Sequence, residues 1–212
     1  QIDALVKSGK TKEQAKLQAA EEYNIECALL KVLGSEALDY VVDETVQIYG
    51  GMGFSEEAPA ARAYRDSRIN RIFEGTNEIN RLLAVGTIMK KAMKGELDIM
   101  KPAMAVQKEL MAIPDFGAEE EGVLTKEKKA IEQAKKAILM IAGAASMHFK
   151  ESFEHQQEIM MDIADMLLEV YASESCVLRA EKLIDRHGLD KSSLVLDITK
   201  TYLSEKKKKI HL

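Results

Sequence analysis

Apolar residues recur at intervals of three and four along most of this chain, and this spacing constrains the fold more than any other feature. Between Thr11 and Gly50 they stand at Ala15, Ala19, Tyr23, Ala28, Leu29, Val32, Leu33, Ala37, Leu38, Val41, Val42 and Val46. Residues at such intervals share one face of an α-helix. No segment of the sequence sustains the apolar–polar alternation of a β-strand. The sequence therefore predicts an all-α protein.

Residues typical of helix ends divide this pattern into segments. Thr11, with Gln14 three residues later, predicts a capping box, and Gly50 predicts a helix end. We expect one long helix between them, with Gly34 as a weak point. A short helix with Pro59 in its first turn should follow, and Thr76 or Asn77 should cap the next. The further helices are expected at residues 58–68, 76–94, 126–150, 153–187 and 192–204.

The helical pattern weakens between residues 95 and 124, around Pro102, Pro114, Asp115-Phe116-Gly117 and the acidic run Glu119–Glu121. We therefore expect three parts: an incomplete helical bundle at 1–94, a linker at 95–124 and a second helical extension domain at 125–212. The final EKKKKIHL is interpreted as a frayed basic tail. Because the sequence begins Gln1-Ile2-Asp3 without an initiator methionine or leader, we expect a piece of a longer protein.

Composition and residue spacing exclude several classes of protein. A hydrophobic content of 46% supplies a real core, which excludes a disordered tail. With a net charge of −5 and no single basic stripe, nucleic acid is not an expected partner. The apolar stretch 137–147 is too short to span a bilayer. No histidine has a glutamate three residues before it, which excludes a di-iron site of that type. Cys27 and Cys176 are isolated, so we predict no metal site and expect two buried free thiols in a reducing compartment.

A charged helical segment is interrupted at Phe73-Glu74-Gly75-Thr76. A solvent loop more often has Asp, Asn, Ser or Pro at such a place, and a glycine is costly inside a core helix. Glu74 is then either a solvated residue near a helix N-terminus, where a carboxylate is mildly favoured, or the reason for the interruption. The local pattern alone favours the first interpretation.

Two longer motifs reverse that preference. VQIYGGMGF (46–54) and YRDSRINRIFEGTNEINRL (64–82) resemble the C-terminal helical domain of acyl-CoA dehydrogenases. Residues 25–54 are most similar to the very-long-chain branch, which carries an additional helical domain. FEHQQEIMMDIADMLLEVYA (153–172) resembles part of that extension. The resemblance implies an N-terminal helical domain and a middle β-domain upstream of this chain.

The resemblance also implies an activity, the α,β-desaturation of a long-chain fatty acyl-CoA to trans-2-enoyl-CoA in fatty-acid β-oxidation. Glu74 matches the family's catalytic base, which takes the α proton while FAD accepts a hydride from the β carbon. Such a carboxylate needs desolvation, and Phe73 would help to exclude water. Gly75 would let the substrate pass close to the backbone.

The same motifs imply contacts with FAD, which in this family is shared across a homodimer. The matched positions are Thr76, Asn77, Glu78, Gln47, Gly50, Gly51 and, in the extension, Gln157. Each has a plainer interpretation as a helix cap, a helix end or an exposed side chain. Arg65 and Asp66 are interpreted as structural residues that fix the loop of Glu74.

Several partners and alternatives stay open. Electron-transfer flavoprotein is the expected electron acceptor, but an acyl-CoA oxidase-like flavoenzyme, or a family member acting mainly as an assembly scaffold, also fits the residues. The Met-rich segment 97–113, which Pro102 interrupts, lies where very-long-chain relatives have a segment linked to membrane association. Packing is the commoner role of such a stripe, so a peripheral membrane contact is only an alternative. We expect bacterial cytoplasm, or the mitochondrial matrix in a eukaryote. The isolated piece should bind FAD poorly and have no turnover.

Overall fold

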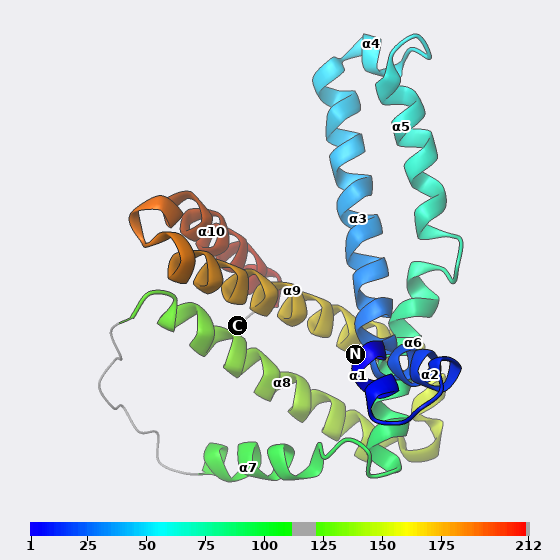
Figure 1. Cartoon of the computed structure of the whole chain (residues 1–212), viewed down its shortest axis with the longest axis vertical. Helices are drawn as coiled ribbons and strands as arrows, with labels where there is room; N and C mark the ends of the chain where they lie inside the picture. The colour runs from blue at the N-terminus through cyan, green and yellow to red at the C-terminus, as the bar shows by residue number, and fades with distance from the viewer. Residues whose placement is uncertain (112–121, 211–212) are drawn as a thin grey trace. The chain divides into compact units, whose positions relative to one another are not determined.

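The computed structural model describes residues 1–111 and 122–210, and all regular secondary structure in those ranges is helical. The predicted all-α fold is confirmed. The chain divides into two compact units, residues 1–91 and 92–212 (Figure 1). Within each unit, the helices pack on one another. The predicted turn at Pro114–Gly117 and the acidic run Glu119–Glu121 lie outside the described residues.

The first unit is built around one long helical hairpin. Its elements are α1 (Ile2–Lys7), α2 (Lys12–Glu22), α3 (Asn24–Tyr49), α4 (Gly51–Phe54), α5 (Pro59–Arg68), the 3-10 turn η1 (Ile69–Arg71) and α6 (Asn77–Met93). Helix α3 packs along α5, and the short α4 lies at the turn between them (Figure 1). This arrangement brings η1 and the start of α6 back towards the N-terminal half of α3.

The predicted capping box is present at the start of α2. The Gln14 backbone N–H donates to Thr11 Oγ1 and the Thr11 N–H donates to Gln14 Oε1, each over 3.2 Å. The expectation of one helix from there to Gly50 is wrong, because Tyr23, with ψ at 12°, separates α2 from α3. The apolar spacing continues across Tyr23, so the pattern carried no signal of the change in direction. Gly34 lies inside α3 without interrupting it.

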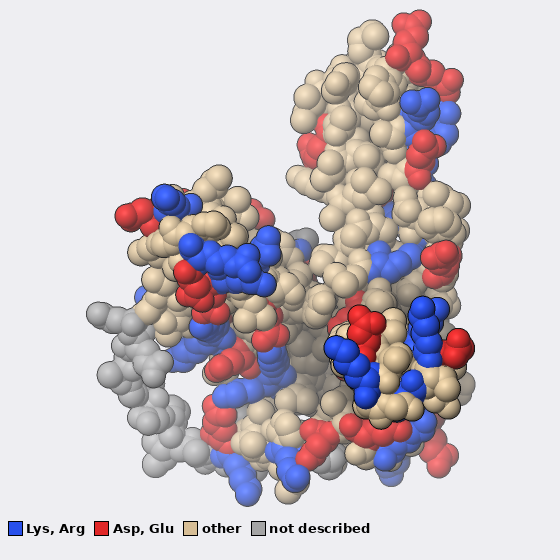
Figure 2. Space-filling model, viewed as in Figure 1, with Lys and Arg blue, Asp and Glu red and all other residues tan. Residues whose placement is uncertain are grey.

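The core of the first unit consists mostly of small side chains. The buried apolar residues are Ala15, Ala28, Leu29, Val32, Val42, Ala58, Ala60, Ala84 and Val85. Larger apolar side chains stay outside, among them Ile48 and Phe54, which are 81% and 84% exposed. Figure 2 shows a broad surface with few charged side chains over the α3 side of the hairpin. By itself, therefore, this unit leaves much apolar surface in contact with water.

The second unit is a set of long antiparallel helices. It comprises α7 (Met100–Met111), α8 (Thr125–Phe149), the 3-10 segment η2 (Lys150–His155), α9 (Gln157–His187), η3 (Asp190–Ser192) and α10 (Ser193–Ile210). Helix α9 packs on both α8 and α10, and α7 packs on α8. Ion pairs from Lys128 to Glu181 and from Lys135 to Glu174 join α8 and α9 in antiparallel register.

The Met-rich segment forms a helix that packs on α8. Pro102 does not interrupt it, because a proline is tolerated in the first turn, where its missing N–H has no intrahelical partner. Val106 is buried, and Lys136 of α8 bonds Glu109 over 2.6 Å. Ala112 and Ile113 lie outside the described residues. Among the described helices, none is both long and apolar enough to cross a membrane. Membrane contact at this segment stays a prediction.

Two further expectations are wrong. The basic end of the chain is not a frayed tail as far as Ile210, because α10 continues to that residue. Lys206 bonds Glu169 over 2.7 Å, and its ammonium lies 5.2 Å from the ring centre of Tyr202. The cysteines are free, but Cys27 is exposed and Cys176 only partly buried. That partial burial raises the pKa of the Cys176 thiol.

Candidate functional site

The interruption at Glu74 is a specific turn rather than a frayed helix end. Glu74 and Gly75 both have left-handed backbone angles, with φ of 52° and 81°. For a non-glycine residue this conformation costs on the order of 1 kcal/mol, so the surroundings must hold it in place. The turn leaves the Glu74 side chain exposed between η1 and α6.

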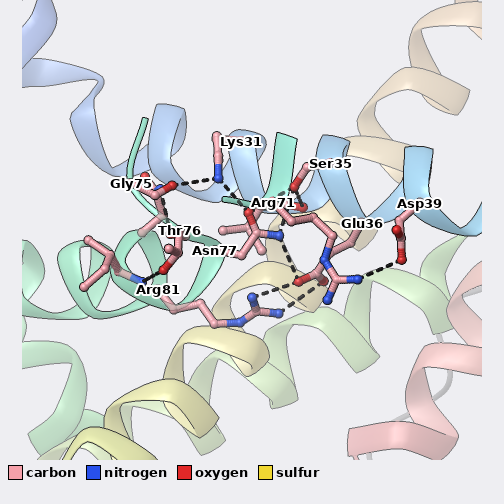
Figure 3. A network of polar contacts seen from close by, with 12 residues as sticks. Lys31, Ser35, Glu36, Asp39, Arg71, Gly75, Thr76, Asn77 and Arg81 are labelled. Carbon is pink, nitrogen blue, oxygen red and sulfur yellow. Dashed lines mark hydrogen bonds and ion pairs between the residues drawn. The ribbon is translucent and has the colours of Figure 1, made fainter. Parts of the chain in front are cut away.

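The carbonyl of Gly75 is fixed by two side chains from different helices. Lys31 Nζ of α3 and Asn80 Nδ2 of α6 each donate to this oxygen over 2.8 Å. Asn80 also donates to the Thr76 carbonyl over 3.0 Å. Figure 3 shows Lys31 between Gly75 and Asn77, with hydrogen bonds to both. The backbone carbonyl directly after Glu74 is therefore tied to both α3 and α6.

Asn77 is the buried centre of this network, with 1% of its surface exposed. Its Oδ1 accepts from Lys31 Nζ over 2.8 Å. Its Nδ2 donates to Ser35 Oγ over 2.9 Å and to Glu36 Oε1 over 3.2 Å (Figure 3). Both amide hydrogens are used within the chain, so the cofactor contact predicted for Asn77 could only involve its backbone.

Ion pairs tie both flanks of the turn to α3. Before the turn, Arg71 bonds Asp39 over 2.8 Å. After it, Arg81 makes a two-pronged pair with Glu36, over 2.8 and 3.1 Å, and only 11% of the Arg81 side chain is exposed. Such partly buried pairs are weak evidence for stability, but they favour one register of the packed elements.

The structural role expected of Arg65 lies elsewhere. Arg65 bonds Glu56 over 2.7 Å in the exposed segment before α5, and the Arg65 guanidinium lowers the pKa of the Glu56 carboxyl. It does not fix the Glu74 turn, a task that falls to Lys31, Arg71 and Arg81.

Sequence reasoning missed the polar face of α3 on which the turn rests. Lys31, Ser35 and Asp39 follow one another at intervals of four, so they share one side of the helix. Ser35 and its neighbour Val32 are both buried. A periodic row of polar residues beside buried apolar ones was a usable signal, since such groups need partners in the fold.

The remaining motif residues around the turn are accessible. Thr76 Oγ1 accepts from the Ile79 N–H over 3.2 Å, which is the geometry of a helix cap. Glu78 is exposed, and a hydrogen bond from its own backbone N–H, followed by one from Thr76, lowers the pKa of its carboxyl. Phe73 is 47% exposed, so within this chain it does not shield Glu74 from water.

The other predicted cofactor residues are not brought to Glu74 within the first unit. Gln47, Gly50 and Gly51 are exposed at the far end of α3. The sixteen residues from Lys31 to Gln47 place them about 24 Å along the helix from the turn. Gln157 is the exposed first residue of α9 in the second unit. Within residues 1–111 and 122–210, no group of three His, Cys, Asp or Glu side chains could hold a metal ion.

The left-handed turn gives a direct test of this geometry. We expect Gly75→Ala to lower the free energy of unfolding by about 1–2 kcal/mol, because alanine disfavours this backbone conformation. The new Cβ would also lie 3.1 Å from Asn80 Nδ2, an atom that binds the Gly75 carbonyl. Urea denaturation of wild-type and variant chains measures the difference.

Gly34→Ala is the matched control for this measurement. Its Cβ would meet no atom within 4 Å, and the residue lies inside α3. We expect this substitution to stabilise the chain by about 0.5–1 kcal/mol. Equal effects of the two substitutions would contradict the turn described here.

Comparisons with known proteins agree with these features. Two family models, both described as the C-terminal domain of acyl-CoA dehydrogenase, match residues 10–89 and 133–212. A probable acyl-CoA dehydrogenase of Bacillus subtilis is 50% identical over 87% of this chain and 31% of its own length. The very long-chain specific acyl-CoA dehydrogenase of Rattus norvegicus mitochondria is 30% identical over 78% of this chain and 28% of its own length.

A solved structure matches nearly the whole chain. The crystal structure of an acyl-CoA dehydrogenase complexed with FAD from Bacillus anthracis aligns with 99% of this chain and 36% of its own, at a TM-score of 0.89 and 44% identity. This chain therefore belongs to the acyl-CoA dehydrogenase family, and the predicted resemblance is confirmed. It spans about a third of the length of these relatives.

Proposed function

We propose that this chain is the C-terminal part of a longer, FAD-dependent acyl-CoA dehydrogenase that desaturates long-chain fatty acyl-CoA in fatty-acid β-oxidation, with Glu74 as the catalytic base. One observation carries the proposal: Glu74 is presented to solvent from a left-handed turn whose next carbonyl is held by Lys31 and Asn80. Strained backbone that its surroundings hold in place is found preferentially at functional sites, which supports a role for this carboxylate.

The surroundings of Glu74 suit proton abstraction from a carbon acid. Exposed apolar side chains flank it, with Ile72 at 48%, Phe73 at 47% and Ile79 at 56% exposure. When substrate and the rest of the protein cover this surface, water is excluded from around the carboxylate and the α carbon. The Glu74 carboxylate would then take the α proton of the acyl thioester, whose carbon chain passes the bare backbone of Gly75.

FAD, when bound, would accept the hydride that leaves the β carbon as the new double bond forms. The residues of this chain fit such a group in two places. Thr76 caps α6, and Asn77 and Glu78 begin its first turn, where backbone N–H groups can meet polar ligand atoms. Around Gly50 and Gly51, Tyr49, Met52 and Phe54 leave apolar surface exposed.

These two places support the proposal of a homodimer. Gln47, Gly50 and Gly51 lie about 24 Å along α3 from the part that holds the Glu74 turn. We therefore propose that they touch the FAD bound mainly by the second subunit, while residues 76–78 touch FAD in their own. The exposed apolar surface over the α3 side of the hairpin also supports the proposal, because such a surface is suited to burial within the assembled protein (Figure 2). Gln157 is proposed as a further contact from the extension.

Flavin reduction in the full-length parent tests the function. Under anaerobic conditions we expect acyl-CoA to bleach the flavin absorbance, most effectively with long chains, as the similarity to a very long-chain enzyme supports. The reduced flavin should then be reoxidised faster by electron-transfer flavoprotein than by oxygen. Faster reoxidation by oxygen would instead favour the oxidase, and no bleaching by any chain length in a flavin-loaded protein would favour the scaffold role.

The isolated chain and its location complete the proposal. Because most of a flavin and substrate pocket would lie in the upstream domains, the isolated 212-residue chain should bind FAD poorly and have no turnover. Stoichiometric FAD in the purified chain would contradict this. Relatives from two Bacillus species support the cytoplasm of a bacterium as the location, with the mitochondrial matrix as the eukaryotic counterpart.

A further inference from the structure

A cavity of about 450 Å³ lies between α8, α9 and α10 of the second unit, a size within the usual range of small-molecule sites. Its apolar walls include Ile131 and Ala134 of α8, Val170 of α9 and Leu203 of α10, all of them buried residues. It does not use the Glu74 turn or any other residue of the first unit. Nothing in the function proposed above requires it.

The charged residues that line the cavity are all lysines: Lys126, Lys129 and Lys206. Lys206 is already paired with Glu169. Lys126 and Lys129 are exposed, and within the described part of the chain neither has an ion-pair or hydrogen-bond partner. They stand in the first turns of α8, a 25-residue helix whose N-terminus adds positive potential. One end of an apolar cavity is therefore suited to an anion.

A hydroxyl group also lines the cavity. Ser173 of α9 lines the cavity with 6% of its surface exposed, and within the described residues its hydroxyl makes no hydrogen bond. The neighbouring Ser175, by contrast, donates to the carbonyl of Tyr171 over 2.7 Å. Ser173 therefore retains a donor for a polar atom of a ligand.

We propose that this cavity binds a single-chain anionic amphiphile, in the simplest case a fatty acid carboxylate. The head group lies against Lys126 and Lys129, and the chain runs along α8 towards Ala134. These eight residues of helix provide about 12 Å of length for the chain. Apolar chain methylenes replace water against Ile131, Val170 and Leu203. The ligand is bound without chemical change.

Photoaffinity labelling of the full-length parent tests the proposal. The probe is a fatty acid of twelve carbons with a diazirine on its chain, and the labelled peptides are mapped by mass spectrometry. We expect label on α8, α9 or α10 residues around the cavity, displaced by dodecanoate. Octanoate should compete far more weakly, since each methylene changes affinity about four-fold. Because the position of the label is read, binding at the proposed catalytic site does not interfere.

Two variants and their controls make the test specific. Ala134→Phe fills the cavity, with Ala144→Phe, on the exposed side of α8, as its control. Lys126→Glu with Lys129→Glu reverses the charge at the cavity end without touching the core. Lys182→Glu with Lys191→Glu changes the net charge equally at exposed positions. Both test variants should lose at least ten-fold in label at the cavity, and both controls should keep it.

Three results would overturn the proposal. The first is the absence of label from all three helices. The second is label that the charge-reversal variant keeps at wild-type intensity, which does not depend on Ala134→Phe folding correctly. The third is equal competition by dodecanol, a neutral chain of the same length, because the lysines would then have no part in recognition. None of these three labelling results bears on flavin reduction by acyl-CoA, which tests the function proposed above. The two proposals therefore fail independently.

Discussion

Glu74→Gln in the full-length parent is expected to slow flavin reduction by acyl-CoA about 10²–10⁴-fold, the usual contribution of a positioned general base. Glutamine keeps the size and polarity of the side chain but cannot take the α proton. The left-handed backbone of Glu74 and the bonds from Lys31 and Asn80 to Gly75 should hold the variant turn in the same place. Anaerobic stopped-flow absorbance of the flavin measures the rate.

Retained cofactor and ligand binding distinguish lost chemistry from lost structure. The variant should keep its FAD and show the spectral shift of bound product-like ligand, while Glu96→Gln, at an exposed position after α6, should reduce flavin at the wild-type rate. Equal rates for Glu74→Gln and wild type would remove Glu74 from the mechanism.

Asn77→Leu is expected to lower the free energy of unfolding of the first unit by about 2–4 kcal/mol, because several buried or half-buried polar groups each lose one hydrogen bond. Lys31 loses one of its two acceptors, and Ser35 and Glu36 each lose the amide donor of Asn77. Leucine has a similar volume, so the loss reports mainly on hydrogen bonds rather than on a cavity. Urea denaturation of the chain, followed by circular dichroism, measures the change.

Asn70→Leu is the matched control for this effect. Asn70 is half-buried and donates one hydrogen bond, to the Ser67 carbonyl over 3.1 Å. Its replacement should cost no more than about 1 kcal/mol. If the two substitutions cost the same, the network around Asn77 would not be what holds the Glu74 turn against α3.

The two predictions together separate the position of Glu74, the proposed base, from its chemistry. Glu74 itself makes no hydrogen bond or ion pair with the described residues, whereas the neighbouring peptide is held from both sides. Removing the carboxylate should therefore affect rate and leave stability nearly unchanged. Removing Asn77 should affect stability first, and rate through the position of the turn.

Much of the architecture was predictable from the sequence because helices are encoded locally. The spacing of apolar residues, the Thr11–Gln14 box, Pro59 and the glycine at 50 predicted most helices to within a few residues. Errors arose where local signals are weak or misleading. Pro102 was taken as an interruption although it stands in a first helical turn, and the change of direction at Tyr23 left the apolar spacing intact.

Some features of the candidate site were likewise predictable from the sequence, and others depended on the tertiary structure. The sequence by itself determined the helical class, the family and the exceptional position of Glu74, since each follows from residues close together along the chain. Only the tertiary structure decided that Asn77 is buried and that Lys31, Ser35, Glu36 and Asp39 form the support of the turn. These partners are separated by more than thirty residues. Such pairings depend on how α3 packs against the segment from η1 to α6, and no local pattern records that packing.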